Sequence, residues 1–301
     1  MSLSTRCQTS WQLLKSSLKV IRRNPKLLLF PVLSTLCSFG LVLFFFLPFF
    51  LIVFANAGFD WADFAADWKV GWPNVGDTFQ GLGYLYGAVL YLACIFAATF
   101  FNVAFYNEII RALTGEPVSL GGGLAFAMRR IRSILMWSLL AGTVGLIIRS
   151  LEERFGWIGR IALAFVGTVW SVAAVFAIPV IIREENINPL AVLRDSAATV
   201  KKTWGESLIG FVGVQLAGAA FVLVSLIFAG WMVLMTLVTH LSWLPFAGLA
   251  VWLPAVLAYS LLIGMATHVY RCALYVYASE GVVPAPYTPE LMDAGWRVRK
   301  R

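Results

Sequence analysis

Seven polar or charged side chains lie at the ends of long apolar stretches, where they could carry chemistry. They are Asn102, Asn107, Glu108, Arg111, Gln215, His268 and Arg271. A carboxylic acid and an imidazole that meet can exchange protons with a substrate, so Glu108 and His268 could serve as an acid and a base. The alternative is ordinary hydrogen bonding between helices and the extension of long side chains towards water. These residue types predict one polar cavity if the elements that carry them converge.

Other motifs that carry chemistry do not occur in the sequence. HExxH and GxSxG are missing, and His240 and His268 are not spaced as a pair of zinc ligands. The run Gly121-Gly122-Gly123 lacks the Lys-Ser or Lys-Thr of a phosphate-binding loop, and indicates a flexible start of a helix. The four cysteines show no CxxC spacing. We therefore predict no catalytic residue, no cofactor site and no metal site.

The elements that must position these residues are membrane helices. Hydrophobic residues make up 60% of the 301-residue chain and charged residues 13%, whereas a soluble domain is about half apolar and a quarter charged. Such a chain is solvated mainly by lipid. The net charge of +8 does not indicate nucleic-acid binding, because the basic residues flank apolar stretches. We expect a single integral membrane domain over residues 1–301.

Six apolar runs are long enough for a helix of about 20 residues to cross the hydrocarbon. They are residues 27–55, 82–107, 133–150, 157–182, 207–239 and 244–279. The predicted fold class is therefore all-α, a polytopic protein with six transmembrane helices. The last two runs exceed one crossing, and each offers a place to bend or end, at Gly230 in one and at Pro245 or Pro254 in the other.

The distribution of Lys and Arg sets the predicted orientation. Nineteen of the 23 lie at or near the two terminal segments, the loop between the second and third runs, and the loop between the fourth and fifth runs. The other four are Lys69, Arg149, Arg154 and Arg160. Cytoplasmic loops carry the excess of Lys and Arg. Both termini are therefore expected in the cytoplasm, and three connections on the outer side.

This orientation predicts how introduced cysteines react in a background without the four native ones. A cysteine at Asp63 should react with a membrane-impermeant maleimide on intact cells, and a cysteine at Ser119 only after permeabilisation. The reverse labelling pattern would show that the orientation is inverted.

Three dibasic pairs precede the first, third and fifth apolar runs. They are Arg22 with Arg23, Arg129 with Arg130, and Lys201 with Lys202. Each pair ends a short stretch with the periodicity of an amphipathic helix, so interfacial helices on the cytoplasmic leaflet and contacts with anionic lipid headgroups are expected. Two explanations stay open: three helix-hairpin pseudo-repeats, or the general attraction of basic residues to cytoplasmic ends of spans.

Two features of the spans concern packing. Gly83 and Gly87 form a GxxxG pattern that allows close approach of another helix, within the chain or in a homo-oligomer. Pro179 lies inside the fourth span, where it should kink the helix, as a structural bend or as a gating hinge.

Part of the chain resembles a known family. The segments FNVAFYNEIIRALTGEPVSLGGGLAFA from Phe101, WSVAAVFAIPVIIREENINPLAVLRDSAATVKKTWGE from Trp170 and SWQLLKSSLKVIRRNPKLLLFP from Ser10 are similar to an uncharacterised family of bacterial six-helix inner-membrane proteins. The resemblance implies a six-helix topology and a bacterial cytoplasmic membrane, and it implies no chemistry.

Three functions are compatible with these patterns. The first is a noncatalytic membrane scaffold or lipid-associated accessory protein, because basic amphipathic stretches are present and catalytic motifs are not. The second is a transporter of a small solute or a lipid, which repeats and Pro-interrupted spans favour. The third is an intramembrane enzyme, which requires Glu108 and His268 to meet.

Overall fold

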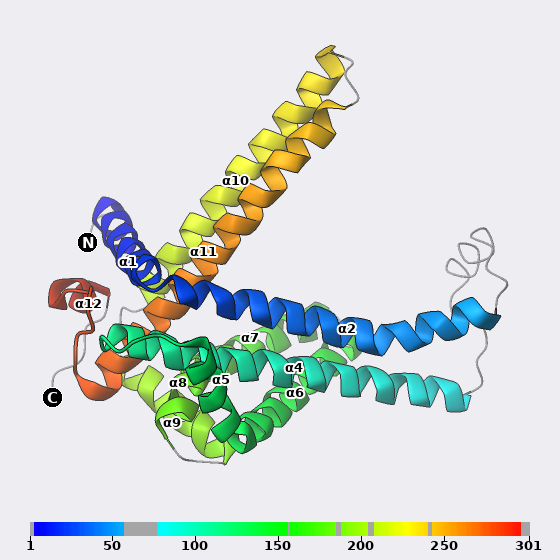
Figure 1. Ribbon diagram of the computed structural model, residues 1–301, viewed down its shortest axis with the longest axis horizontal. Coiled ribbons are helices and arrows are strands. Elements are labelled where there is room, and N and C mark those ends of the chain that lie inside the picture. Colours follow the sequence, from blue (N-terminus) through cyan, green and yellow to red (C-terminus); the bar gives the residue numbers. More distant parts are fainter. Residues whose placement is uncertain are drawn as a thin grey trace.

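The computed structural model describes residues 3–56, 77–155, 157–184, 188–203, 208–239 and 243–295. All regular elements in these ranges are helices (Figure 1). The first half contains α1 (Leu3–Arg23), the 3₁₀ helix η1 (Pro25–Leu28), α2 (Leu29–Asn56), α4 (Asp77–Leu113), α5 (Leu120–Arg129) and α6 (Ile131–Arg154). The second half contains α7 (Trp157–Ala173), α8 (Ala177–Arg183), α9 (Pro189–Thr203), α10 (Leu208–Thr239), α11 (Leu244–Glu280) and α12 (Pro289–Gly295).

Five helical stretches are long and apolar enough to cross a membrane among the residues that the structure describes. They are Pro25–Leu47, Leu85–Leu113, Ile131–Glu152, Gly159–Arg183 and Phe246–Glu280. Each coincides with one of the predicted runs. The remaining run, 207–239, is helical as α10, but its apolar stretch with described side chains is shorter, Leu223–Thr239. The all-α class is confirmed, and the sixth crossing stays a prediction.

The long helices form three antiparallel hairpins, α2 with α4, α6 with α7, and α10 with α11. Hairpin α10–α11 diverges from hairpin α2–α4, and the two come together where α1, α5, α9 and α12 gather (Figure 1). A shorter helix precedes each hairpin, namely α1, α5 and α9. These three helices pack differently, because α1 lies against α10 and α11 whereas α5 contacts α4 and α6. A true repeat stays a prediction.

The hydrophobic core lies at the end where the hairpins converge. Along α11, the side chains from Met265 to Val276 are mostly buried, whereas Leu253 and Leu257 are exposed. The same change occurs along α4, where Val103 and Ile109 are buried and Leu85 is exposed. Exposed aliphatic side chains on long helices are normal where lipid is the solvent. Gly230 and Pro254 were predicted as places where the helices could bend or end. The helix α10 continues through Gly230, and α11 continues through Pro254.

Helix α1 uses its apolar face to hold the core together. Leu13, Leu14 and Ile21 are buried, and the helix packs against α10, α11 and α12. The Ser17 hydroxyl donates to the Leu13 carbonyl at 3.1 Å, so the Tyr287 hydroxyl at 2.7 Å donates to Ser17. Burial raises the pKa of Tyr287 and keeps this donor protonated. The apolar face therefore contacts protein, and not the leaflet expected of an interfacial helix.

The predicted fourth span is interrupted near Pro179, between α7 and α8. The turn lies at residues 174–176, upstream of the proline, which is the third residue of α8 and is buried. A buried serine on α9 supplies hydrogen-bond partners to backbone groups at this break. The Ser196 hydroxyl donates to the Ala173 carbonyl at 2.6 Å and accepts from the Phe176 N–H at 3.0 Å. Backbone groups freed by a helix break need such partners in an apolar environment.

The structure gives no support to close packing at Gly87 within the chain. A β-carbon added to Gly87 would have no heavy atom within 4 Å, and the surroundings of Gly83 lie outside the described side chains. The small residues between α4 and α6 are on α6 instead, where added β-carbons would lie 2.7 Å from Leu92 at Gly142 and 2.7 Å from Tyr91 at Gly145. A contact at the GxxxG pattern, within the chain at Gly83 or in a homo-oligomer, therefore stays a prediction.

Candidate functional site

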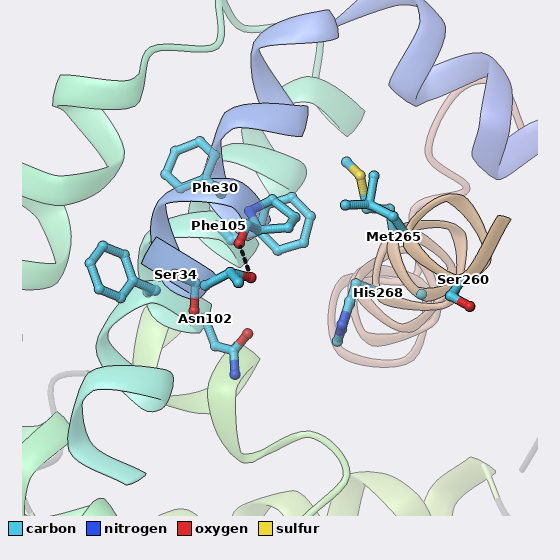
Figure 2. Close-up of a pocket in the computed structure, with 12 residues that line it drawn as sticks. Phe30, Ser34, Asn102, Phe105, Ser260, Met265 and His268 are labelled. Atoms are coloured by element: carbon cyan, nitrogen blue, oxygen red, sulfur yellow. Dashed lines mark hydrogen bonds between the residues drawn. The ribbon is translucent and has the colours of Figure 1, made fainter. Parts of the chain in front are cut away.

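A cavity of about 260 Å³ lies where α2, α4 and α11 meet (Figure 2). It is lined by Phe30, Pro31, Ser34, Thr35, Phe101, Asn102, Phe105, Ser260, Leu261, Gly264, Met265 and His268. The lining combines apolar and aromatic side chains with a few uncharged polar groups. That combination is typical of small-molecule sites.

The polar part of the lining is concentrated on Asn102 and His268. Figure 2 shows both side chains extending into the gap between α4 and α11, whereas the Ser260 hydroxyl points away from it. The Asn102 amide has no hydrogen-bond partner among the described residues. The Thr35 hydroxyl is already engaged with the Pro31 carbonyl at 2.8 Å. An unpaired amide inside a span is costly in hydrocarbon, so Asn102 is available to a polar occupant.

A chain of two hydrogen bonds links His268 through Tyr106 to Arg271. Arg271 Nη1 donates to the Tyr106 hydroxyl oxygen at 3.3 Å, and this hydroxyl lies 2.7 Å from His268 Nδ1. Tyr106 is buried, so its single hydrogen needs an acceptor, and Nδ1 supplies one if it carries no proton. The imidazole is then the neutral tautomer with hydrogen on Nε2, the ring nitrogen that is free to donate.

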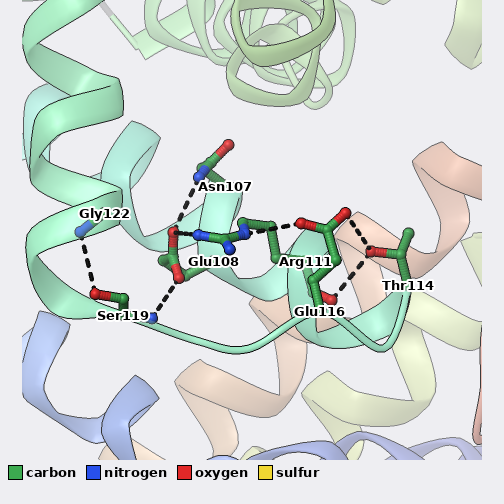
Figure 3. Close-up of polar contacts among 7 residues, drawn as sticks. All are labelled: Asn107, Glu108, Arg111, Thr114, Glu116, Ser119 and Gly122. Atoms are coloured by element: carbon green, nitrogen blue, oxygen red, sulfur yellow. Dashed lines mark hydrogen bonds and ion pairs between the residues drawn. The ribbon is translucent and has the colours of Figure 1, made fainter.

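A second polar network surrounds Glu108 at the end of α4 (Figure 3). Glu108 Oε1 accepts from Asn107 Nδ2 at 3.0 Å and from Arg111 Nη1 at 3.3 Å, and Oε2 accepts from the Ser119 backbone N–H at 2.7 Å. Arg111 Nε also donates to Glu116 at 3.0 Å. The buried carboxylate thus ties the end of α4 to the loop that leads into α5.

The loop and the start of α5 have local causes in the sequence. Gly115, with φ at 84°, turns the chain out of α4 in the left-handed conformation that favours glycine. The Ser119 hydroxyl caps α5 by accepting from the Gly122 N–H at 3.3 Å. Gly123 is buried, and a β-carbon there would lie 2.9 Å from the Ala104 carbonyl, the Glu108 Cγ and the Phe30 ring. Within the glycine run, Gly123 is therefore tightly packed, whereas a β-carbon added to Gly121 would meet no atom within 4 Å.

The seven predicted polar residues thus fall into different groups. Asn102 and His268 share the cavity, and Tyr106 links His268 to Arg271. The structure joins Asn107, Glu108 and Arg111 around the α4–α5 loop. These contacts join the described residues in two groups, and a single cluster of all seven stays a prediction. The side chain of Gln215 lies outside the described residues, and a functional role for any of the seven stays a prediction.

The six predicted lipid-contacting residues belong to the end where the hairpins converge. Arg22 and Arg23 end α1 and are exposed, as are Arg129 and Lys201, while Arg130 is half-buried between α5 and α6. The guanidinium carbons of Arg129 and Arg130 lie 5.7 and 5.8 Å from the centre of the Phe126 ring. The side chain of Lys202 is not among those described.

Tyr106 and Ser196 are the residues that sequence reasoning missed. Tyr106 is separated from His268 by 162 positions, and a tyrosine among aromatic residues is ordinary in a span. The only signal was its place beside Asn107 and Glu108 in the polar end of the run. Ser196 resembles any small residue on a helix, and only the break between α7 and α8 shows its use.

Comparisons with known proteins give one match. The family model described as "Family of unknown function (DUF6159)" matches residues 82–284, which include most of α4, the helices α5 to α11, and two of the three walls of the cavity. No curated protein and no solved structure matches the chain significantly.

Proposed function

We propose that this chain, which belongs to the family of unknown function DUF6159, is a noncatalytic integral membrane protein that binds a membrane lipid in the cavity between α2, α4 and α11. The bacterial cytoplasmic membrane, with both termini in the cytoplasm, is part of the proposal. It rests on one observation: an uncharged polar cavity that opens between helices with apolar exposed surfaces.

The position of the cavity argues for a lipid rather than a water-soluble ligand. Beyond the cavity along α2, Leu36 and Phe39 are exposed, and beyond it along α11, Leu253 and Leu257 are exposed. Both flanks are therefore suited to hydrocarbon, and a ligand that enters between them passes through the bilayer. An amphiphile can place its polar end on Asn102 and His268 while its chain stays among the aliphatic side chains.

The basic surface supports the same orientation. The exposed side of α1 and η1 carries Lys15, Lys19, Arg22, Arg23 and Lys26. Each basic residue near an anionic leaflet contributes about 1 kcal/mol of attraction. This surface would hold the convergent end of the hairpins against the cytoplasmic leaflet and keep the cavity at the level of lipid headgroups.

Transport of the bound lipid is the second candidate function. The break between α7 and α8 favours it, because transporters commonly use interrupted helices. The intramembrane-enzyme hypothesis needed Glu108 and His268 to act together. Glu108 accepts from Asn107, Arg111 and Ser119, and His268 Nδ1 bonds to Tyr106. This arrangement lends that hypothesis no support.

A filled cavity should stop lipid binding. Gly264 lines the cavity, and a β-carbon there would meet no heavy atom within 4 Å, so Gly264→Phe is the variant chosen to fill the cavity with a ring. Gly230→Phe is the matched control, because Gly230 is equally open but lies on α10, away from the cavity.

The measurement is photocrosslinking in vesicles that contain diacylglycerol and phosphatidylglycerol, each with a diazirine close to the glycerol. We expect peptides from the cavity-lining parts of α2, α4 and α11 to be labelled by at least one probe. Gly264→Phe should reduce this labelling to background, and Gly230→Phe should leave it unchanged. Equal labelling of the wild type and both variants would refute the proposal.

A further inference from the structure

We infer that the cavity recognises the oxygen atoms of an uncharged lipid headgroup, with the Nε2–H of His268 and the amide of Asn102 as hydrogen-bond donors. Diacylglycerol, with a free hydroxyl and two ester carbonyls, represents this class. The inference rests on the proposed function and adds the chemistry of the headgroup.

The lining excludes a headgroup that carries its own charge. No Asp, Glu, Lys or Arg is among the described residues that line the cavity. An ionised phosphate placed there would lose its water without gaining a cation in contact, and such burial of an unpaired charge is strongly unfavourable. An ammonium headgroup would also lack a carboxylate, because the oxygens of Glu108 are used by Asn107, Arg111 and Ser119.

The hydrogen bonds from Arg271 through Tyr106 to His268 favour a ligand atom that accepts a hydrogen bond. Arg271 donates to Tyr106, and the single hydrogen of Tyr106 finds its acceptor at Nδ1 when Nδ1 carries no proton, which is the tautomer in which His268 presents a donor at Nε2. Arg271 also places a positive charge two side chains behind the cavity, which favours an oxygen with partial negative charge over a donor group. Arg271 and Tyr106 are thus positioning residues, and His268 and Asn102 are the contacts.

The volume of the cavity fits a lipid whose headgroup lies inside the cavity while most of its acyl chains lie outside. Pockets that enclose a whole drug-sized ligand have volumes of about 300–1,000 Å³, and this cavity has about 260 Å³. It holds a glycerol with the first carbons of its acyl chains, near Phe30, Phe105 and Met265. The rest of each chain extends between the diverging hairpins, where exposed aliphatic side chains line α2 and α11.

The test compares the two photoactivatable lipids in equal amounts in one vesicle. We expect diacylglycerol to label the cavity peptides several times more strongly than phosphatidylglycerol. His268→Phe keeps a ring of similar size but removes the donor, and should reduce diacylglycerol labelling by about fivefold, the value of one hydrogen bond. His268→Gln keeps an N–H donor and should restore most of it.

Tyr106→Phe tests the positioning chain separately. It removes no atom from the cavity lining, yet it frees the proton of His268 to move to Nδ1, so diacylglycerol labelling should fall while the protein remains monodisperse. Stronger labelling by phosphatidylglycerol, equal labelling by both lipids, or diacylglycerol labelling that is unchanged in His268→Phe would overturn the inference while lipid binding stands. Background labelling by both lipids in the wild type would refute the proposed function itself.

Discussion

Glu108→Ala should destabilise the protein by about 3 kcal/mol, which is within the usual range for breaking a buried ion pair from one side. The substitution leaves the Ser119 N–H and the side chains of Asn107 and Arg111 without their shared acceptor. Unpaired donors near the core cost about 1–3 kcal/mol each, less where water can reach them. The free energy of unfolding in mixed detergent micelles measures the effect.

Glu116→Ala is the matched control for this prediction. Glu116 pairs with the same arginine, Arg111, at 3.0 Å, but its side chain is largely exposed. Exposed ion pairs contribute about 0–1 kcal/mol, so this variant should unfold close to the wild type. If the two variants were equally stable, the carboxylate of Glu108 would not be holding the α4–α5 loop.

Gly123→Ala should also lower stability, by about 1–3 kcal/mol, because an added methyl group would overpack the core. Its β-carbon would lie 2.9 Å from a backbone carbonyl and from two side chains that belong to α4 and α2. At Gly122, the nearest atom would be the end of the Arg111 side chain at 3.3 Å, which can move. At Gly121, a methyl group would meet open space.

Alanine substitutions at the three glycines should therefore change the melting temperature by graded amounts. Gly121→Ala should raise it slightly, since alanine favours a helix over glycine by about 1 kcal/mol. Gly122→Ala should change it little, and Gly123→Ala should lower it by several degrees. A uniform response of the three variants would contradict the packing at Gly123.

Helix positions were predictable because they depend on local composition. Each predicted run overlaps an observed helix, as for 244–279 and α11 (Leu244–Glu280). In lipid, an uninterrupted apolar stretch forms a helix because its backbone groups must bond to one another. The interruption near Pro179 was also anticipated from proline chemistry. Its location at 174–176 fits the same chemistry, because Pro179 cannot donate to the carbonyl of Val175 four residues upstream. The partner Ser196 was not anticipated, because it lies on a different helix.

The candidate site was only partly predictable, because its contacts join distant parts of the chain. The sequence identified Asn102 and His268 as polar residues at the same level, and the structure places both on one cavity. It grouped them with Glu108, since spacing along the chain gives the relative directions of side chains on α4 but not which neighbouring element each of them meets. The role of Tyr106 follows from a contact with a helix that lies 162 positions later.

The location of the core at the convergent end has a consequence for biosynthesis. The apolar face of α1, with Leu13, Leu14 and Ile21, packs on α10 and α11, which are translated well after it. While the intervening helices insert, this face has no native partner and needs lipid or a chaperone to cover it. Core formation therefore waits until α10 and α11 have been synthesised, and closing contacts between such distant segments makes assembly slow. A ribosome that stalls before α11 would leave the first helix exposed and the nascent protein marked for degradation.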